Sequence, residues 1–419
     1  MANQEHLALI KQGVDVWNEW YKKNKRVIPD LATINLSGFN LSGINLQRAN
    51  LRGANLSHAD LTKAQLVNAD LVGANFLAAD LKDANLKAAN LDYVIFSQAK
   101  LNAKTIIAAK NRNVWEIVNN KTQDKSFNGA DLRNSNLFRA ELSKVDLSHA
   151  KLENANLNSA NLNNAYLFKA DLTGANLQNA DLRNAYFSQA NLTKAYLSGA
   201  LCCGTYFKDA DLKFAVLKRA KFSHKTMIDL KWHSVWEIVN RGAAKKNLSG
   251  IDLSNANLQG VNFAEANLSH ANLSNANLSQ SNLDLANLTN TDLAGANVSG
   301  VDLNQANLRG AKLKSVIGRD TQLPVAVKPI QTSVMVQEKP TTIQTVATLD
   351  PSQAALVDSP QTKPNTKTNI FGLVLAGLIT SAIAVSYVVL TQNPNISWQD
   401  LLQKLQPWKD KVEKLIPIN

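Results

Sequence analysis

Two glutamates lie at equivalent places in two copies of one hexapeptide and could do acid–base chemistry. The hexapeptide VWEIVN occurs twice, 121 residues apart, and carries Glu116 in one copy and Glu237 in the other. A carboxylate acts as a general acid or base only beside a group that positions it and shifts its pKa. Neither glutamate has such a partner nearby in the sequence. We therefore expect structural joints at Trp115 and Trp236, with a partner-binding bulge as the alternative and catalysis as the weakest interpretation.

The other reactive groups do not form a recognisable constellation. Cys202 and Cys203 are the only cysteines and are adjacent, which is too few for a disulfide framework and favours a reducing compartment. No glycine-rich loop of the GxxxxGK or GxGxxG type opens a helix. The sequence therefore predicts a protein that is not an enzyme, with no catalytic residues, no metal site and no cofactor.

Most of the chain follows a period of five residues. An apolar residue, here called the centre, recurs at every fifth position over 31–101, 127–222 and 248–313, which gives forty-nine centres. Ala stands two residues before most centres, Asn or Asp stands one before, and the two residues after are polar or small. This period matches neither an α-helix nor a plain strand.

A coil with four sides accounts for the period. The centre and the residue two before it are spaced as in a short extended segment, so both point inward. The two residues after the centre have turn-forming chemistry and make a corner. Four such sides close a coil of 20 residues, and coils stacked at about 4.8 Å make a solid prism without an interior cleft. Aromatic residues are only 6% of the chain, so its core must be built from small aliphatic side chains.

The repeats ANLRG, ADLTK, ADLVG, ANLTK and ANLSN resemble those of the pentapeptide-repeat proteins. The resemblance covers about 250 residues and implies a right-handed quadrilateral β-helix. It implies no single function, since most members look like binding or scaffold proteins and a minority mimic DNA and protect topoisomerases. We therefore expect an all-β solenoid in three blocks with short helical inserts, followed by one C-terminal transmembrane helix.

The expected organisation follows from where the period starts, breaks and ends. Each break is 26 residues long, which is one more than five sides, so each shifts the register by one. The expected parts are an N-terminal helical cap at 1–30, block 1 at 31–110, an insert at 111–126, block 2 at 127–228, an insert at 229–247 and block 3 at 248–318. A disordered linker at 319–369, a transmembrane helix at 370–390 and an amphipathic tail at 391–419 complete the chain.

The net charge of +12 suggests nucleic acid or anionic lipid as a partner, but the repeats do not support mimicry of DNA. Block 1 has eight basic and five acidic residues, block 2 has thirteen and eight, and block 3 has three and five. A DNA mimic is acidic along its length because each imitated phosphate is negative. Nucleic acid is therefore a disfavoured partner, and a protein that binds nucleic acid or a topoisomerase is kept as the alternative function.

The C-terminal region predicts a membrane anchor. Residues 370–390 are 21 residues without a charge, long enough to cross a hydrocarbon core of about 30 Å. A buried core helix is the alternative, but no domain remains to bury it. The tail has an apolar face with two tryptophans and fits a helix lying on the bilayer or one docking on a partner. The N-terminus has no signal-peptide pattern, so we expect a single-pass bacterial membrane protein with the repeats on the cytoplasmic side.

One group of side chains stands out from the repeats. Tyr166, Tyr186 and Tyr206 replace the usual Asn or Asp at intervals of 20 residues, so they should stack on one face, bordered by Phe168. Grouped exposed aromatics often mark an interface, although such a ladder can also simply stabilise the coils. Tyr196 lies two sides away, on the opposite face.

From these features we expect a non-catalytic, membrane-anchored scaffold that presents a rigid β-helix to protein partners. An effector role for the span and tail, through oligomerisation or sensing of the bilayer, is a further alternative.

Overall fold

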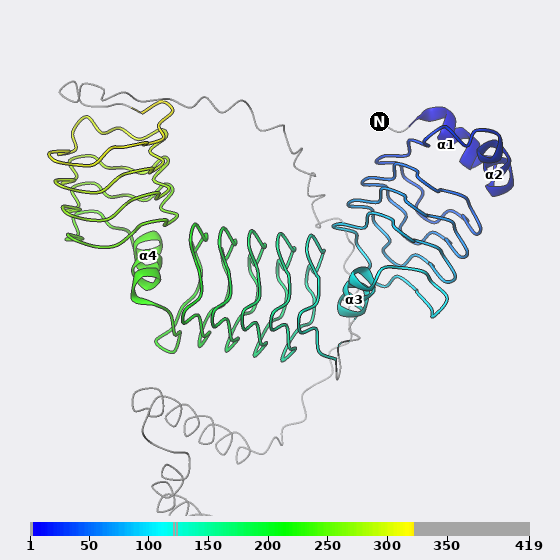
Figure 1. Cartoon of the computed structure of the whole chain (residues 1–419), viewed down its shortest axis with the longest axis horizontal. Helices are drawn as coiled ribbons and strands as arrows, with labels where there is room; N and C mark the ends of the chain where they lie inside the picture. Colours follow the sequence, from blue (N-terminus) through cyan, green and yellow to red (C-terminus); the bar gives the residue numbers. More distant parts are fainter. Residues whose placement is uncertain (1–2, 120–121, 123–124, 322–419) are drawn as a thin grey trace, which may run out of the picture. The chain divides into compact units, whose positions relative to one another are not determined.

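The computed structural model describes residues 3–119, 122 and 125–321. Their regular elements are four helices, α1 (Gln4–Lys11), α2 (Val14–Lys23), α3 (Ala109–Val118) and α4 (Leu230–Arg241). Stacked coils follow α2, α3 and α4, so the helices lie at the ends of the coil stacks (Figure 1). α3 begins two residues before the insert that the sequence predicted at 111.

The coils are held together by isolated parallel β-bridges. Each bridge joins the residue before one centre to its equivalent in the next coil, as in Asn35 to Asn55 and Asn55 to Asn75. Backbone hydrogen bonds accompany the bridges, and the Leu56 N–H donates to the Asn75 carbonyl at 2.8 Å. The 20-residue step confirms the predicted β-helical coil of four five-residue sides.

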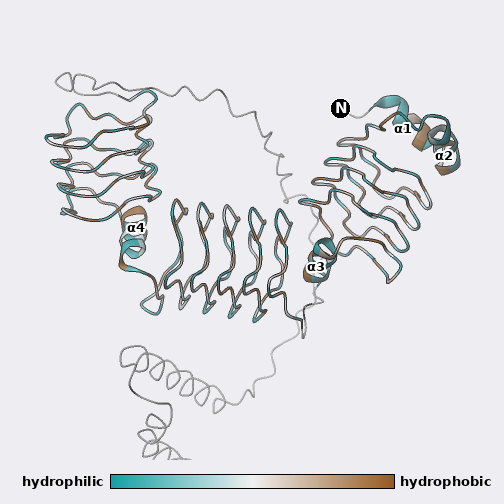
Figure 2. Ribbon diagram, in the orientation of Figure 1, coloured by the Kyte–Doolittle hydropathy of each residue, from teal (hydrophilic) through white to brown (hydrophobic). Residues whose placement is uncertain are grey.

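The interior of each stack is filled by the two inward positions of every side. Ala54 and Leu56 are completely buried, and almost all centres between the block ends are exposed by 5% or less. Where Phe replaces Leu at successive coils the rings stack, with centroids 5.9 Å apart for Phe76 and Phe96. Apolar and polar segments alternate along each coil (Figure 2). Burial of these aliphatic side chains is the main source of stability.

The corners explain the polar residues after each centre. The second of them has a positive φ, +58° at Lys63 for example, and the next N–H closes the turn, as Ala64 does to the Leu61 carbonyl at 3.1 Å. A positive φ at the third residue of a four-residue turn is typical of a type II turn. Gly occupies this position without strain, and Asn tolerates it better than most residues. The turn chemistry predicted for the corners is therefore present.

The outward Asn or Asp before each centre has two tasks. The Asn55 Oδ1 accepts the Ser57 backbone N–H at 3.2 Å, which fixes the start of the corner. The Asn55 Nδ2 donates to the Asn35 Oδ1 at 3.1 Å, one coil away. The same pairs recur in all three blocks, as in Asn156 with Asn136 and Asn267 with Asn247. The preference for Asn and Asp, visible in the sequence but unexplained by it, comes from these bonds.

The first coil of block 1 is covered by two helices. The sequence predicted a helical cap at 1–30, and Gly13, with a φ of +116°, divides this cap into α1 and α2. The Trp17 indole N–H donates to the Asn45 carbonyl at 2.7 Å, and the Tyr21 hydroxyl donates to the Gln47 carbonyl at 3.0 Å. Helix α2 therefore binds the coil by hydrogen bonds as well as by packing.

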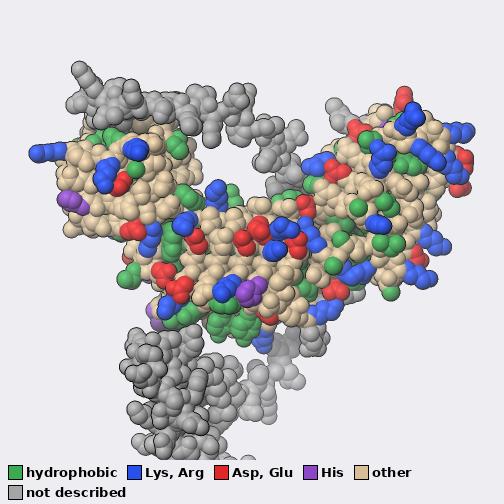
Figure 3. All heavy atoms as spheres, viewed as in Figure 1, with side chains coloured by type: hydrophobic (Ala, Val, Ile, Leu, Met, Phe, Trp, Pro, Cys, Tyr) green, Lys and Arg blue, Asp and Glu red, His purple; other side chains and the backbone are tan. Residues whose placement is uncertain are grey.

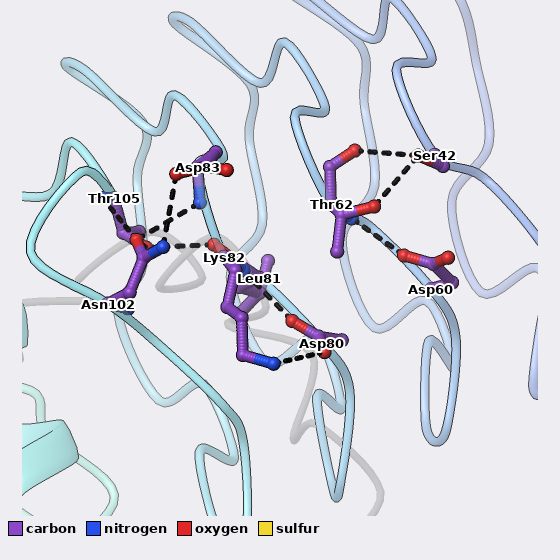
Figure 4. Close-up of polar contacts among 9 residues, drawn as sticks. All are labelled: Ser42, Asp60, Thr62, Asp80, Leu81, Lys82, Asp83, Asn102 and Thr105. Atoms are coloured by element: carbon purple, nitrogen blue, oxygen red, sulfur yellow. Dashed lines mark hydrogen bonds and ion pairs between the residues drawn. The ribbon is translucent and has the colours of Figure 1, made fainter.

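The one-residue register shift begins in the last coil of a block. Bridges there join residues 21 apart, Asn85 to Ile106 in block 1 and Tyr206 to Met227 in block 2. The extra residue lies in a wider turn, where the Thr105 hydroxyl donates to the Leu81 carbonyl at 2.9 Å. Figure 4 shows this turn beside the ordinary corners, with Asn102 linked to both Asp83 and Thr105.

Among the residues that the structure describes, no helix has both the length and the apolar character needed to cross a membrane. The predicted span at 370–390, the tail at 391–419 and the linker from 322 onward lie outside those residues.

Candidate functional site

The three tyrosines predicted to stack do lie on one face of block 2. Parallel bridges join Tyr166 to Tyr186 and Tyr186 to Tyr206. The rings of Tyr166 and Tyr186 are stacked, with centroids 5.2 Å apart and planes 6° apart. The ring of Tyr206 is 6.4 Å from that of Tyr186 and tilted by 37°. We call these three tyrosines and Phe168 the Tyr strip.

Three of the four side chains of the Tyr strip are exposed to solvent, and Tyr206 is half-buried. Tyr166 is 49% exposed, Tyr186 is 41% exposed and Phe168 is 37% exposed. The ring of His149 meets Phe168 edge-on at 5.6 Å, and the Lys169 ammonium lies 5.1 Å from the centroid of the same ring. A lysine this close to a ring face makes a cation–π contact. The strip therefore combines ordered aromatic rings with a positive charge at its border.

Met227 continues the same face and was missed by the sequence interpretation. It bridges to Tyr206 and is 52% exposed. A step of 20 residues from Tyr206 leads to residue 226. The residue that follows Tyr206 on this face is Met227 instead, because the wider turn before it adds one residue. The turn at Thr105 adds one residue in the same way, since Asn85 bridges to Ile106. The sequence shows that an extra residue is present, but only the structure shows where it lies.

Tyr196 occupies the same type of position away from the strip. It bridges to Asn176 and Val216 and is 47% exposed. Within the described part of the chain, its ring stacks on no other aromatic ring. Tyr196 is therefore a natural control for the strip, since it matches Tyr186 in backbone position and exposure but not in ring contacts.

The two predicted joint tryptophans are buried against the ends of their blocks. The Trp115 indole N–H donates to the Ala99 carbonyl at 2.7 Å, and that of Trp236 donates to the Ala220 carbonyl at 2.8 Å. The following asparagines repeat the match, with Asn119 donating to the Phe96 carbonyl and Asn240 to the Leu217 carbonyl, both at 3.0 Å. These positions are all related by the 121-residue repeat.

Each joint also ties neighbouring blocks together directly. The Tyr93 N–H donates to the Asn134 carbonyl at 2.7 Å, and the equivalent Phe214 N–H donates to the Asn255 carbonyl at 2.8 Å. A coil edge that would otherwise lack a partner is therefore paired across the insert.

The glutamates of the hexapeptides pair with single cations. Glu116 lies 2.7 Å from the Lys125 ammonium, and Glu237 lies 2.9 Å from the Arg241 guanidinium. Neither pair involves a histidine or a second carboxylate. The Glu237–Arg241 pair is exposed and contributes little stability, whereas the Glu116 carboxylate is largely buried beside Lys125.

The remaining reactive groups are dispersed. Complete burial raises the pKa of the Cys202 thiol above its usual range, so it stays protonated and unreactive. Cys203 is half-buried, with its Sγ 3.7 Å from the Lys221 carbonyl. In the described ranges, no three His, Cys, Asp or Glu side chains are grouped so that they could hold a metal ion. Basic and acidic side chains are interspersed over the visible face of the blocks (Figure 3).

Comparison with known families identifies the repeats. Eight copies of the family pattern described as pentapeptide repeats match residues 31–66, 40–76, 79–103, 126–154, 146–184, 185–223, 247–284 and 286–317. Together they cover more than half of the chain and end before the predicted linker. A search of curated proteins finds no match.

Solved structures of other pentapeptide-repeat proteins are also similar. HetL, involved in heterocyst differentiation regulation in the cyanobacterium Nostoc, is 24% identical over 71% of this chain and 94% of its own, with a TM-score of 0.20. A protein from the thylakoid lumen of Arabidopsis thaliana is 32% identical over 28% of this chain and 78% of its own, with a TM-score of 0.18. Full-length QnrB1, a plasmid-mediated fluoroquinolone resistance protein, is 14% identical over 66% of this chain and 92% of its own, with a TM-score of 0.20.

The five-residue period, the 20-residue coil and the eight family matches agree, and the chain belongs to the pentapeptide-repeat family.

Proposed function

We propose that this protein is a non-catalytic scaffold that binds a partner protein through the Tyr strip and is held at a membrane by residues 370–390. One observation carries the binding role. The rings of Tyr166 and Tyr186 are stacked at 5.2 Å although nearly half of each side chain faces solvent. Most surface positions of the repeats carry short polar side chains, so this ordered aromatic face is unusual within the molecule.

Stacking prepares the strip for binding. Each ring is already held by its neighbour and by the β-bridges beneath it, so little side-chain freedom remains to be lost when a partner docks. Tyrosines combine a large apolar face with a hydroxyl, and such residues are enriched among those that dominate binding energy. His149 and Lys169 border Phe168 and favour a partner with an acidic group beside its apolar contact.

The described residues supply no competing catalytic arrangement. The coils are filled by buried Leu and Ala, and the hexapeptide glutamates are joined to Lys125 and Arg241. Binding on an outer face is the role that a filled solenoid supports best.

The membrane part of the proposal rests on the sequence. Residues 370–390 form an uncharged apolar segment of spanning length, preceded by a polar segment at 319–369 that suits a tether.

Affinity capture from native membranes tests the binding role. The bait is the full chain, compared with the double variant Tyr166→Ala/Tyr186→Ala and with Tyr196→Ala as the matched control. We expect a protein recovered by the wild type and by Tyr196→Ala to be depleted at least tenfold with the double variant. Equal recovery by all three baits, with circular dichroism showing the folded coil in each, would remove the strip from the proposal.

A further inference from the structure

The last two residues of α2, Lys22 and Lys23, and the five residues that follow form a basic and apolar segment at the N-terminal end of block 1. It comprises residues 22–28, here called the 22–28 loop, with the sequence KKNKRVI. All of its side chains except the half-buried Asn24 are exposed. Val27 is 41% exposed and Ile28 is 54% exposed, and Val16 on α2 is 40% exposed. Four cations therefore stand within five residues, directly before two uncovered aliphatic side chains.

The backbone holds these side chains outward. The Val27 N–H donates to the Asn24 carbonyl at 2.9 Å, which closes a turn at the end of α2. Pro29 is buried, and its carbonyl accepts the Asn50 N–H at 2.8 Å. These two hydrogen bonds fix the backbone at both ends of the loop, and in this arrangement the side chains of Val27 and Ile28 face solvent instead of the first coil.

The charge of the loop is only partly balanced. Glu19 lies 2.5 Å from the Lys22 ammonium, and Asp15 is the other exposed carboxylate on α2. Lys23, Lys25 and Arg26 are in no ion pair among the described residues, although the charge of Lys23 also helps to lower the pKa of the Glu19 carboxyl. Figure 3 shows Lys and Arg side chains gathered over the end of the molecule where Figure 1 places α2.

We propose that the 22–28 loop binds the surface of a membrane that contains anionic lipids. Lys23, Lys25 and Arg26 would contact headgroup phosphates, and Val27 with Ile28 would enter the boundary between headgroups and acyl chains. Basic residues beside exposed apolar ones are the combination that such a surface attracts. This contact does not depend on residues 370–390, so it gives the protein a second and separate attachment at its other end.

The chemistry favours lipid over nucleic acid. A single strand is bound by aromatic side chains that stack on bases, whereas the uncovered side chains here are aliphatic. Phosphate contacts alone would leave Val27 and Ile28 in water. In a bilayer interface, the cations and the aliphatic side chains gain favourable contacts at the same time.

Flotation with protein-free vesicles tests the proposal. The chains compared are the full protein and one lacking 370–390, a deletion that removes none of the contacts described above. The vesicles are phosphatidylcholine alone or phosphatidylcholine with phosphatidylglycerol. We expect the deleted chain to float only with the anionic vesicles and to be released by salt.

Three sets of variants in the deleted chain separate charge from insertion. Each basic residue adds about fivefold to binding at an anionic surface, so Lys23→Gln/Lys25→Gln/Arg26→Gln should lower the partition coefficient roughly 100-fold. Val27→Ser/Ile28→Ser should lower it several-fold. The control Lys63→Gln/Lys87→Gln/Lys104→Gln removes three exposed cations from block 1 and should change it little.

Several outcomes would overturn the proposal. The first is that the deleted chain floats equally with neutral and with anionic vesicles. The second is that the control variant lowers the partition coefficient as much as Lys23→Gln/Lys25→Gln/Arg26→Gln does. The third is that Val27→Ser/Ile28→Ser leaves the partition coefficient unchanged. Absence of vesicle binding together with saturable binding of polyglutamate would assign the loop to an acidic protein instead. With neutral vesicles, the difference in flotation between the full chain and the deleted chain reports on 370–390, so a failure of the predicted anchor is distinguishable from a failure of the loop.

Discussion

Removal of Tyr186 should cost more stability than removal of Tyr196, because only Tyr186 lies between two other rings. Tyr186→Ala deletes the stacked contact with Tyr166 and the tilted contact with Tyr206. Tyr196→Ala deletes a side chain of similar exposure, 47% against 41%, and so a similar buried apolar area. An aromatic pair contributes about 0.5–1.5 kcal/mol beyond its buried area, so two pairs make Tyr186→Ala more costly by about 1–3 kcal/mol.

A double-mutant cycle isolates the stacked pair. The free energy of unfolding is measured in urea for the wild type, Tyr166→Ala, Tyr186→Ala and the double variant. We expect the double variant to lose about 0.5–1.5 kcal/mol less than the sum of the single variants, which is the coupling of the two rings. Repeat proteins can unfold in parts, so the urea dependence must be the same in all four chains for the comparison to hold.

A coupling near zero, with equal losses for Tyr186→Ala and Tyr196→Ala, would refute the stacked arrangement. If the coupling energy has the expected size but the same variants do not change partner capture, the Tyr strip stabilises the coils and does not bind the partner. The two measurements therefore separate the interpretations that the sequence left open for these tyrosines.

Three further predictions concern the core, a joint and a corner. Ser135→Ala should stabilise the protein by about 1 kcal/mol, because this buried hydroxyl makes no hydrogen bond among the described residues. Thr205→Ala should destabilise it, because the variant loses the 2.7 Å hydrogen bond from the Thr205 hydroxyl to the Leu182 carbonyl. Urea unfolding measures both free energies, and equal effects of the two variants would contradict the reasoning. Trp236→Phe should lower the free energy of unfolding by about 1–3 kcal/mol in the same assay, because it removes the indole N–H that donates to the Ala220 carbonyl. An unchanged free energy would show that this hydrogen bond is dispensable. The Arg133 guanidinium lowers the pKa of Asp131 to about 2. The small stabilisation that Arg133→Gln removes should therefore be fully present above about pH 4 and be lost as the pH falls through about 2. A stability difference between wild type and Arg133→Gln that stays constant over this acid range would refute the reasoning.

The sequence predicted the parts of the fold that depend on counting residues. A strict period of five defines which side chains point inward, so the buried positions of Ala54 and Leu56 follow from the repeat alone. The spacing of 20 between Tyr166 and Tyr186 placed both on one face for the same reason. Local patterns of this kind transfer to three dimensions because each coil repeats the geometry of the last.

Other features depend on contacts that no period encodes. Both inserts contain an extra residue, but its place is decided by hydrogen bonds such as that from the Thr105 hydroxyl to the Leu81 carbonyl. Met227, which continues the face of the Tyr strip, was missed on that account. The division of the N-terminal helix at Gly13, and the outward orientation of Val27 and Ile28, likewise follow from how the first coil binds its neighbours.

The two joints make matching bonds 121 residues apart, and this has a consequence for how the chain can change over generations. Unequal recombination between the two copies at matching positions would remove or add one block together with one joint. Each new junction would still place a tryptophan, an asparagine and a threonine on the carbonyls that they bind now. Descendants of this gene can therefore differ by whole blocks and still fold, and each added block brings a new outer face whose residues are free to diverge.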